Sequence, residues 1–83
     1  MKITIKLFAL LGAYLPPGAS KNQAEMTVGE DATIAEVIAA LNLPLEHCHL
    51  VLVNGTYVAP GARAETHLKE GDALAIWPPV AGG

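Results

Sequence analysis

The chain has 83 residues, of which 52% are hydrophobic and 16% charged, and its formal net charge is −3. This length is enough for one small domain, and the high apolar content excludes an intrinsically disordered chain. The five Lys and Arg residues are scattered, so we expect no nucleic-acid partner, because phosphate binding requires clustered cations.

The single cysteine, Cys48, excludes a disulfide framework. A small domain with a free thiol fits a reducing compartment, so we expect a cytoplasmic protein. A signal peptide is the alternative, because two lysines precede an uncharged run over residues 7–15. The alternation of residues 2–7 favours a strand instead, and the run is too short to span a bilayer, so we expect no membrane association.

Alternating apolar and polar residues predict a first strand over residues 2–8 and a second over residues 24–28. Residues 9–22 are rich in turn formers and are predicted to form a loop, with a helical turn at residues 9–15. The first strand has one apolar face and one polar face, so its apolar face is expected to pack on a core.

A helix is predicted to begin at Thr33, which forms a capping box with Glu36. Its apolar residues recur with helical spacing on one stripe: Ile34, Val37, Ile38 and Leu41. Asn42 and Pro44 end the helix. A stripe this narrow is typical of a helix that lies across a sheet.

A nearly all-apolar third strand is predicted over residues 49–53, and Asn54-Gly55 favours a tight hairpin turn into a short return at residues 56–58. A last strand is predicted over residues 73–77. This order predicts an α+β fold, the β-grasp (ubiquitin-like) roll, with a mixed sheet of four to five strands and one main helix on one face. The first and last strands would be parallel neighbours at its centre. We expect a domain over residues 1–77 and an extended tail over residues 78–83.

A catalytic site is not predicted, because the sequence has no Gly-rich phosphate loop. Cys48 lies between His47 and His49, which suggests a metal site or a nucleophile. Side chains that alternate across a strand cannot converge on one ion, so we expect ordinary strand-edge residues and no metal. A chain this small is also expected to lack a substrate-sized cleft. The protein is therefore predicted to be a substrate or subunit of another protein and not an enzyme.

The tail is apolar up to its two glycines: Pro78, Pro79, Val80, Ala81, Gly82 and Gly83. A frayed terminus is one interpretation, but a solvated tail has no reason to carry these apolar residues. The prolines favour an extended chain, and Gly82 and Gly83 can pass where only backbone fits. We expect this tail to deliver the Gly83 carboxylate into a partner's active site. A carboxylate needs activation before it reacts, and no ATP site is apparent in this chain.

The sequence resembles the MoaD/ThiS family of sulfur-carrier proteins over its full length, and most resembles the MoaD type, the small subunit of molybdopterin synthase. The resemblance rests on four segments: Lys6-Leu7-Phe8-Ala9, Val53-Asn54-Gly55 with Val58, Leu68-Lys69-Glu70-Gly71-Asp72, and Trp77-Pro78-Pro79-Val80-Ala81-Gly82-Gly83. The Pro-Pro pair favours the molybdopterin type over the ThiS type. The stretch Leu10-Leu11-Gly12-Ala13 departs from the family pattern, because it lacks an Arg-Glu pair found in many MoaD-like chains.

The resemblance implies that a MoeB-like E1 enzyme adenylates Gly83 with its own ATP and Mg, while this chain binds no cofactor. A sulfur donor of cysteine desulfurase or rhodanese type would convert the adenylate to a thiocarboxylate. A MoaE-like large subunit would accept the tail, and the sulfur would pass to cyclic pyranopterin monophosphate in molybdenum or tungsten cofactor synthesis. A thiazole (thiamine) carrier, a ubiquitin-like protein modifier and a plain interaction module are the alternatives.

The partner interface is predicted to include aromatic residues around the tail. Phe8 and Trp77 end the first and last strands on the face opposite the apolar core set, so they should adjoin if these strands are parallel neighbours. Tyr57 is expected to join them. Exposed aromatic residues grouped near a functional group are typical of binding hot spots, although burial of Phe8 or Trp77 in the core is the alternative.

Overall fold

The computed structural model describes residues 1–79, so the predicted tail residues Val80, Ala81, Gly82 and Gly83 lie outside the described residues. It contains five strands: β1 (Lys2–Leu7), β2 (Gln23–Thr27), β3 (Leu50–Val53), β4 (Thr56–Tyr57) and β5 (Ala73–Trp77). One α-helix, α1 (Ile34–Ala40), and three short 3-10 helices accompany them: η1 (Ala9–Tyr14), η2 (Leu45–His47) and η3 (Pro60–Ala62).

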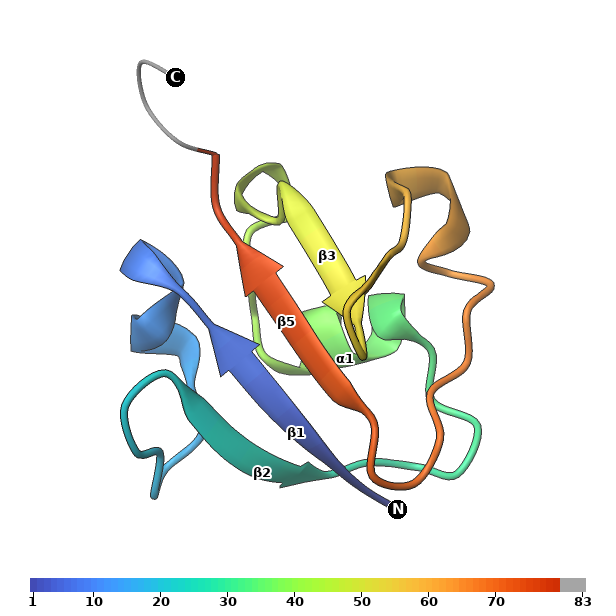
Figure 1. Ribbon diagram of the computed structural model, residues 1–83, viewed down its shortest axis with the longest axis horizontal. Coiled ribbons are helices and arrows are strands. Elements are labelled where there is room, and N and C mark those ends of the chain that lie inside the picture. Colours follow the sequence, from blue (N-terminus) through green and yellow to red (C-terminus); the bar gives the residue numbers. More distant parts are fainter. Residues whose placement is uncertain (80–83) are drawn as a thin grey trace.

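The strands form a single sheet in the order β2-β1-β5-β3-β4, with α1 behind it (Figure 1). β1 and β5 pair in parallel near the centre, whereas β1–β2, β5–β3 and β3–β4 are antiparallel. This arrangement confirms the predicted mixed sheet with one helix on one face and with the first and last strands as parallel neighbours.

The core lies between the sheet and α1. The inward side chains of β1, β3 and β5 are buried together with the stripe of α1: Ile3, Ile5, Leu7, Val51, Leu74, Ile76, Ile34, Val37 and Ile38. Each such aliphatic side chain contributes about 1.5–3 kcal/mol when it leaves water. Within the described residues 1–79, the other face of the sheet carries no helix.

Local signals set the ends of α1 as predicted. The Glu36 N–H donates to Thr33 Oγ1 at 3.1 Å, and the Thr33 N–H donates to Glu36 Oε1 at 2.8 Å, which completes the capping box. Asn42 follows the C-cap with a φ of 60°, the left-handed conformation that commonly ends a helix.

The turn between β3 and β4 has the predicted form, because Asn54 and Gly55 have φ values of 50° and 85°. The Asn54 side chain also donates to Asp72 Oδ1 and accepts the Ala73 N–H, each at 2.9 Å. These bonds fasten the hairpin to the start of β5.

Some boundaries differ from the prediction. β1 ends at Leu7, because Ala9 adopts a φ of 52° and turns the chain into η1 directly after Phe8. η1 confirms the predicted helical turn, whereas η2 and η3 were not predicted because a single 3-10 turn is too short to show a periodic pattern. Within residues 1–79, no helix has the length and apolar content needed to cross a membrane.

Candidate functional site

The candidate site is the end of the sheet at which the central strand β5 stops and the chain continues into Pro78 and Pro79 (Figure 1). Because β1 and β5 are parallel, their C-terminal ends lie together, and the Phe8 N–H donates to the Ile76 carbonyl at 3.2 Å. The Phe8 and Trp77 rings stack with centroids 4.3 Å apart and planes 4° from parallel. The predicted contact between these two residues is therefore confirmed.

Both rings are half-buried, so neither belongs to the core. Their stack covers the outer face of the sheet, opposite the side that packs on α1. Such aromatic pairs contribute about 0.5–1.5 kcal/mol beyond the area they bury. The exposed parts of the rings remain available to a partner at the point where the tail begins.

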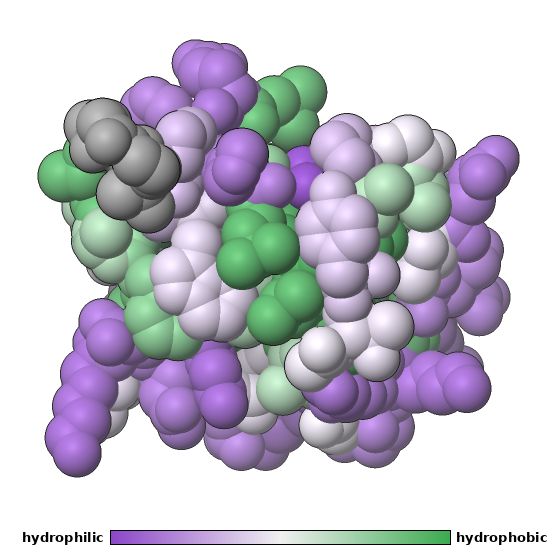
Figure 2. Space-filling view, turned by 45° about the horizontal axis from the view of Figure 1, so that its top comes forward, coloured by the Kyte–Doolittle hydropathy of each residue, from purple (hydrophilic) through white to green (hydrophobic). Residues whose placement is uncertain are grey.

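The strand register extends this aromatic pair into an apolar strip across the outer face. Leu50 pairs with Trp77, and Leu52 pairs with both Ala75 and Tyr57. Residues paired in this way point to the same side of a sheet. We define the apolar strip as Phe8, Trp77, Leu50, Ala75, Leu52 and Tyr57. Figure 2 shows a hydrophobic area in the middle of this face, bordered by paler and hydrophilic residues.

Tyr57 lies on the predicted face and is 55% exposed, but it does not sit beside the two stacked rings. Leu52 on β3 lies between Tyr57 and β5. The sequence reasoning missed Leu50 and Leu52, because an almost entirely apolar strand gives no signal that separates its two faces. The pairing of Leu50 with Trp77 supplies that signal once the register is known.

Two exposed leucines lie at the same end of the sheet. Leu10 is 78% exposed on η1, directly after Phe8, and Leu45 is 73% exposed on η2, which precedes β3. The segment that follows η2 is hydrogen-bonded to the end of β5, since the His49 N–H donates to the Trp77 carbonyl at 3.0 Å. Exposed large apolar residues grouped around one end of a sheet are typical of a protein interaction site.

Arg63 holds the segment before β3 in place through hydrogen bonds. The sequence did not predict this role, because residues 61–66 show no recognisable motif. It is buried, and its Nη1 donates to the Cys48 carbonyl at 2.8 Å while its Nη2 donates to the His49 carbonyl at 3.4 Å. Its Nε has no hydrogen-bond partner among residues 1–79. The guanidinium therefore links η3 to the start of β3, the strand that carries Leu50.

Cys48 is buried, and its thiol lies 3.5 Å from the Pro44 carbonyl oxygen. Burial raises the pKa of the Cys48 thiol, Arg63 lowers it in part, and Glu46 adds a smaller increase. A protonated, buried thiol is a poor nucleophile and a poor metal ligand. His47 and His49 are exposed on either side of it, and residues 1–79 contain no group of three or more His, Cys, Asp or Glu side chains that could hold a metal ion.

The prediction that the chain has no cleft of substrate size is wrong. An open groove of about 420 Å³ runs between β2 and α1. The groove is separate from the apolar strip. Its walls come from the edge strand β2 and from α1 on the inner side of the sheet, whereas the strip lies on the outer face.

A mixed sheet with parallel first and last strands and one helix across its inner face defines the class of ubiquitin-like β-grasp proteins. The ThiS family model matches residues 6–83, and the chain belongs to this family. A search of curated protein sequences finds no match.

Solved structures with the same fold include three kinds of protein. The small archaeal modifier protein 1 of Haloferax volcanii is 27% identical, with 95% of this chain and 98% of that chain covered and a TM-score of 0.70. The thiamine biosynthesis protein ThiS of Geobacter metallireducens is 20% identical over the whole of both chains, with a TM-score of 0.68. A complex of subunits 1 and 2 of the molybdopterin-converting factor of Helicobacter pylori is 19% identical over the whole of both chains, with a TM-score of 0.61.

Proposed function

We propose that the protein is the sulfur-carrier subunit of a molybdopterin synthase, with the Gly83 carboxylate as the group that carries sulfur. The observation that supports this most directly is the apolar strip at the end of β5. A globular handle with a stacked aromatic pair beside the exit of the tail is suited to being gripped by a partner while the tail enters that partner's active site.

The proposed cycle uses other proteins for its chemistry. An E1-like enzyme of MoeB type would join the Gly83 carboxylate to the AMP part of ATP and release pyrophosphate, with Mg bound by that enzyme. The persulfide of a sulfur donor of cysteine desulfurase or rhodanese type would then displace AMP to form an acyl disulfide. A second thiol on one of the partner proteins would attack the donor's sulfur in that bond, releasing the thiocarboxylate and leaving a disulfide on the partner. In a MoaE-like large subunit, the sulfur would pass to cyclic pyranopterin monophosphate, and water would restore the carboxylate. This chain contributes position and access: Pro78 to Ala81 would lead into the partner's site, and Gly82, which has no side chain, would let Gly83 reach the reacting groups.

The large-subunit partner is supported by the Helicobacter pylori structure, which pairs subunit 1 of a molybdopterin-converting factor with its subunit 2. In our proposal, Phe8, Trp77 and the leucines of the apolar strip would contact such a partner. Half-buried aromatic residues at the centre of an apolar surface are typical hot spots.

The intact mass of the protein tests the carrier role. After co-expression with its E1-like enzyme and sulfur donor, a mass gain equal to one sulfur in place of one oxygen is expected on the wild type. Deletion of Gly83 should abolish the gain, whereas Lys21→Ala, an exposed change in the loop before β2, should leave it intact. An unchanged wild-type mass under these conditions would favour an interaction module with an inert tail.

Two other carrier functions are separated by further readouts. A protein modifier is favoured by the likeness to the small archaeal modifier protein 1, and it would leave covalent adducts on partner lysines in place of a sulfur-bearing free protein. A thiazole carrier would rescue thiamine synthesis in a host that lacks its own carrier. Our proposal expects rescue of molybdoenzyme activity and no rescue of thiamine synthesis.

A further inference from the structure

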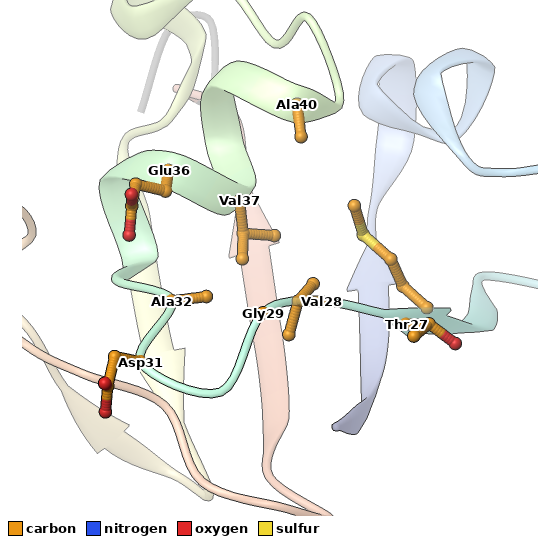
Figure 3. A pocket seen from close by; sticks show the side chains of 9 residues that line it. Thr27, Val28, Gly29, Asp31, Ala32, Glu36, Val37 and Ala40 are labelled. Carbon is orange, nitrogen blue, oxygen red and sulfur yellow. The ribbon is translucent and has the colours of Figure 1, made fainter.

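The groove between β2 and α1 is lined by apolar side chains from both elements. Val28 and Met26 from the β2 side and Ala32, Val37 and Ala40 from the α1 side contribute to its lining. Figure 3 shows Val28, Ala32 and Val37 directed into the space between the helix and the strand. Val37 is buried, whereas Met26, Val28 and Ala32 are half-buried and Ala40 is exposed. The groove is therefore an apolar surface that residues 1–79 leave uncovered.

Among residues 1–79, the strand beside the groove has a free edge over Glu25 and Thr27, whereas Gln23 is bridged to Ser20. β2 is the outermost strand of the sheet, and its even-numbered residues bond to β1: the Val28 N–H donates to the Met1 carbonyl, and the Asn22 carbonyl accepts the Leu7 N–H. Because the bonding direction alternates along an antiparallel strand, the N–H and C=O groups of Glu25 and Thr27 point outward. An edge of this kind is a template for pairing with another strand.

The charge around the groove has one sign. Asp31 and Glu36 belong to its lining, and no Lys or Arg does. Figure 3 shows both carboxylates at one end of the groove. Glu25 adds a third carboxylate on the outer face of β2, where its backbone faces the free edge. A segment that pairs with β2 would thus meet apolar residues on its inner side and carboxylates on its outer side and at one end.

We propose that the β2–α1 groove binds an extended segment of a partner protein, which adds as an antiparallel strand to β2, with apolar residues alternating with Lys or Arg. The apolar residues would enter the groove beside Met26 and Val28, and the basic residues would lie beside Glu25. Strand addition of this kind gives affinity through main-chain hydrogen bonds and specificity through alternate side chains. A second copy of this chain fits less well, because two acid-rimmed grooves would repel each other.

The groove lies far from the apolar strip. Val28 pairs with Met1, at the start of β1, whereas Phe8 and Trp77 lie beyond the end of β1, about 20 Å away along a six-residue strand. A partner held at the groove would leave the apolar strip and the Pro78 end of β5 free. The carrier could then be retained by one protein while a second one uses its tail. The proposal does not depend on which cargo the tail carries.

A short probe peptide of matching pattern, acetyl-KVKLKVK-amide, tests the site on the full chain. Titration followed by NMR should shift the amide signals of Glu25, Thr27 and Ala40, and should protect the Glu25 and Thr27 amides from exchange. A control peptide of the same sequence carries a methyl group on the backbone nitrogen of each lysine. It keeps its charge and its apolar side chains but loses the backbone N–H donors that face β2. It should bind at least about tenfold more weakly, a loss of about 1.4 kcal/mol.

A matched pair of helix variants locates the binding. Ala40→Arg places a bulky cation in the groove and should weaken the peptide about tenfold or more. Ala39→Arg changes an equally exposed neighbour outside the groove and should bind as the wild type does. Sulfur loading of Gly83 should be the same in both variants, so failure here is distinguishable from failure of the carrier function.

Several outcomes would overturn the proposal. They are absence of peptide binding, equal binding of the N-methylated peptide, or shifts confined to the Trp77 end of the sheet. Self-association of the wild type that Ala40→Arg abolishes would assign the groove to a second copy instead. A tail-deleted chain that exposes the groove more than the full chain would assign it to the protein's own tail.

Discussion

The outer face of the sheet has a polar half and an apolar half. On β2 and β1 it carries Lys2, Thr4, Lys6, Gln23, Glu25 and Thr27. On β5, β3 and β4, and at Phe8 just beyond the end of β1, it carries the apolar strip. Both halves belong to one sheet, and no helix in residues 1–79 covers either of them. The polar half is a normal solvated strand surface, so only the apolar half needs a partner to explain its composition.

The largest expected effect is on partner binding when the apolar half loses its aromatic anchor. Trp77→Ala should weaken binding to a MoaE-like large subunit by about 2–4 kcal/mol, as for hot-spot residues. The free energy of unfolding should fall by less, because Trp77 is only half-buried. Calorimetric titration and urea unfolding measure the two quantities. Lys6→Ala, in the polar half, is the control, and equal binding of the Trp77 variant would refute the role of the strip.

The second effect concerns what holds the apolar half in place. Arg63→Ala removes the donors to the Cys48 and His49 carbonyls and should lower the free energy of unfolding by about 2 kcal/mol, since buried acceptors lose their partners. Hydrogen exchange should accelerate at His49 and Leu50 before it changes in β1 and β2. Lys69→Ala, an exposed cation in the following stretch, should have little effect. Uniform acceleration across the sheet would contradict a local brace.

A smaller effect is expected at the corner that places Phe8 over Trp77. Ala9 has a φ of 52°, which is strained for a residue with a Cβ. Ala9→Gly should therefore raise the free energy of unfolding by up to about 1 kcal/mol, with the Gly entropy offsetting part of the relief. Ala13→Gly in the same 3-10 helix should have the opposite sign. Thermal unfolding of both variants checks this, and destabilisation by Ala9→Gly would show that the corner is unstrained.

The smallest effect is a pH dependence next to the brace. Because the pKa of Cys48 is raised above its ordinary value of 9.0 in the folded chain, the unfolded chain loses this proton first as the pH rises. The stability contributed by the neutral thiol is thus complete below the unfolded pKa and declines above pH 9. Urea unfolding from pH 7 to 10 should show this slope in the wild type and not in Cys48→Ala. Rapid alkylation of native Cys48 at neutral pH would contradict its burial.

The sequence predicted the elements well where the signal is local. Thr33 and Glu36 defined the start of α1, Asn54-Gly55 defined the hairpin, and the alternation of β1 identified its buried face. The parallel pairing of β1 with β5 followed from the order of elements, and it in turn predicted the contact of Phe8 with Trp77. The role of the tail rests on its sequence and on membership of the ThiS family, since Val80 to Gly83 lie outside the described residues.

Other features depended on neighbours that are distant in the sequence. Leu50 and Leu52 became part of the apolar strip only through their register with Trp77 and Tyr57. Arg63 gained its role from two carbonyls 14 and 15 residues away. The groove formed because α1 crosses the sheet without covering the edge of β2. Periodicity and capping are properties of a short segment and can be read from it, whereas the identity of an uncovered face, a buried brace or a groove is fixed only when separate segments pack together.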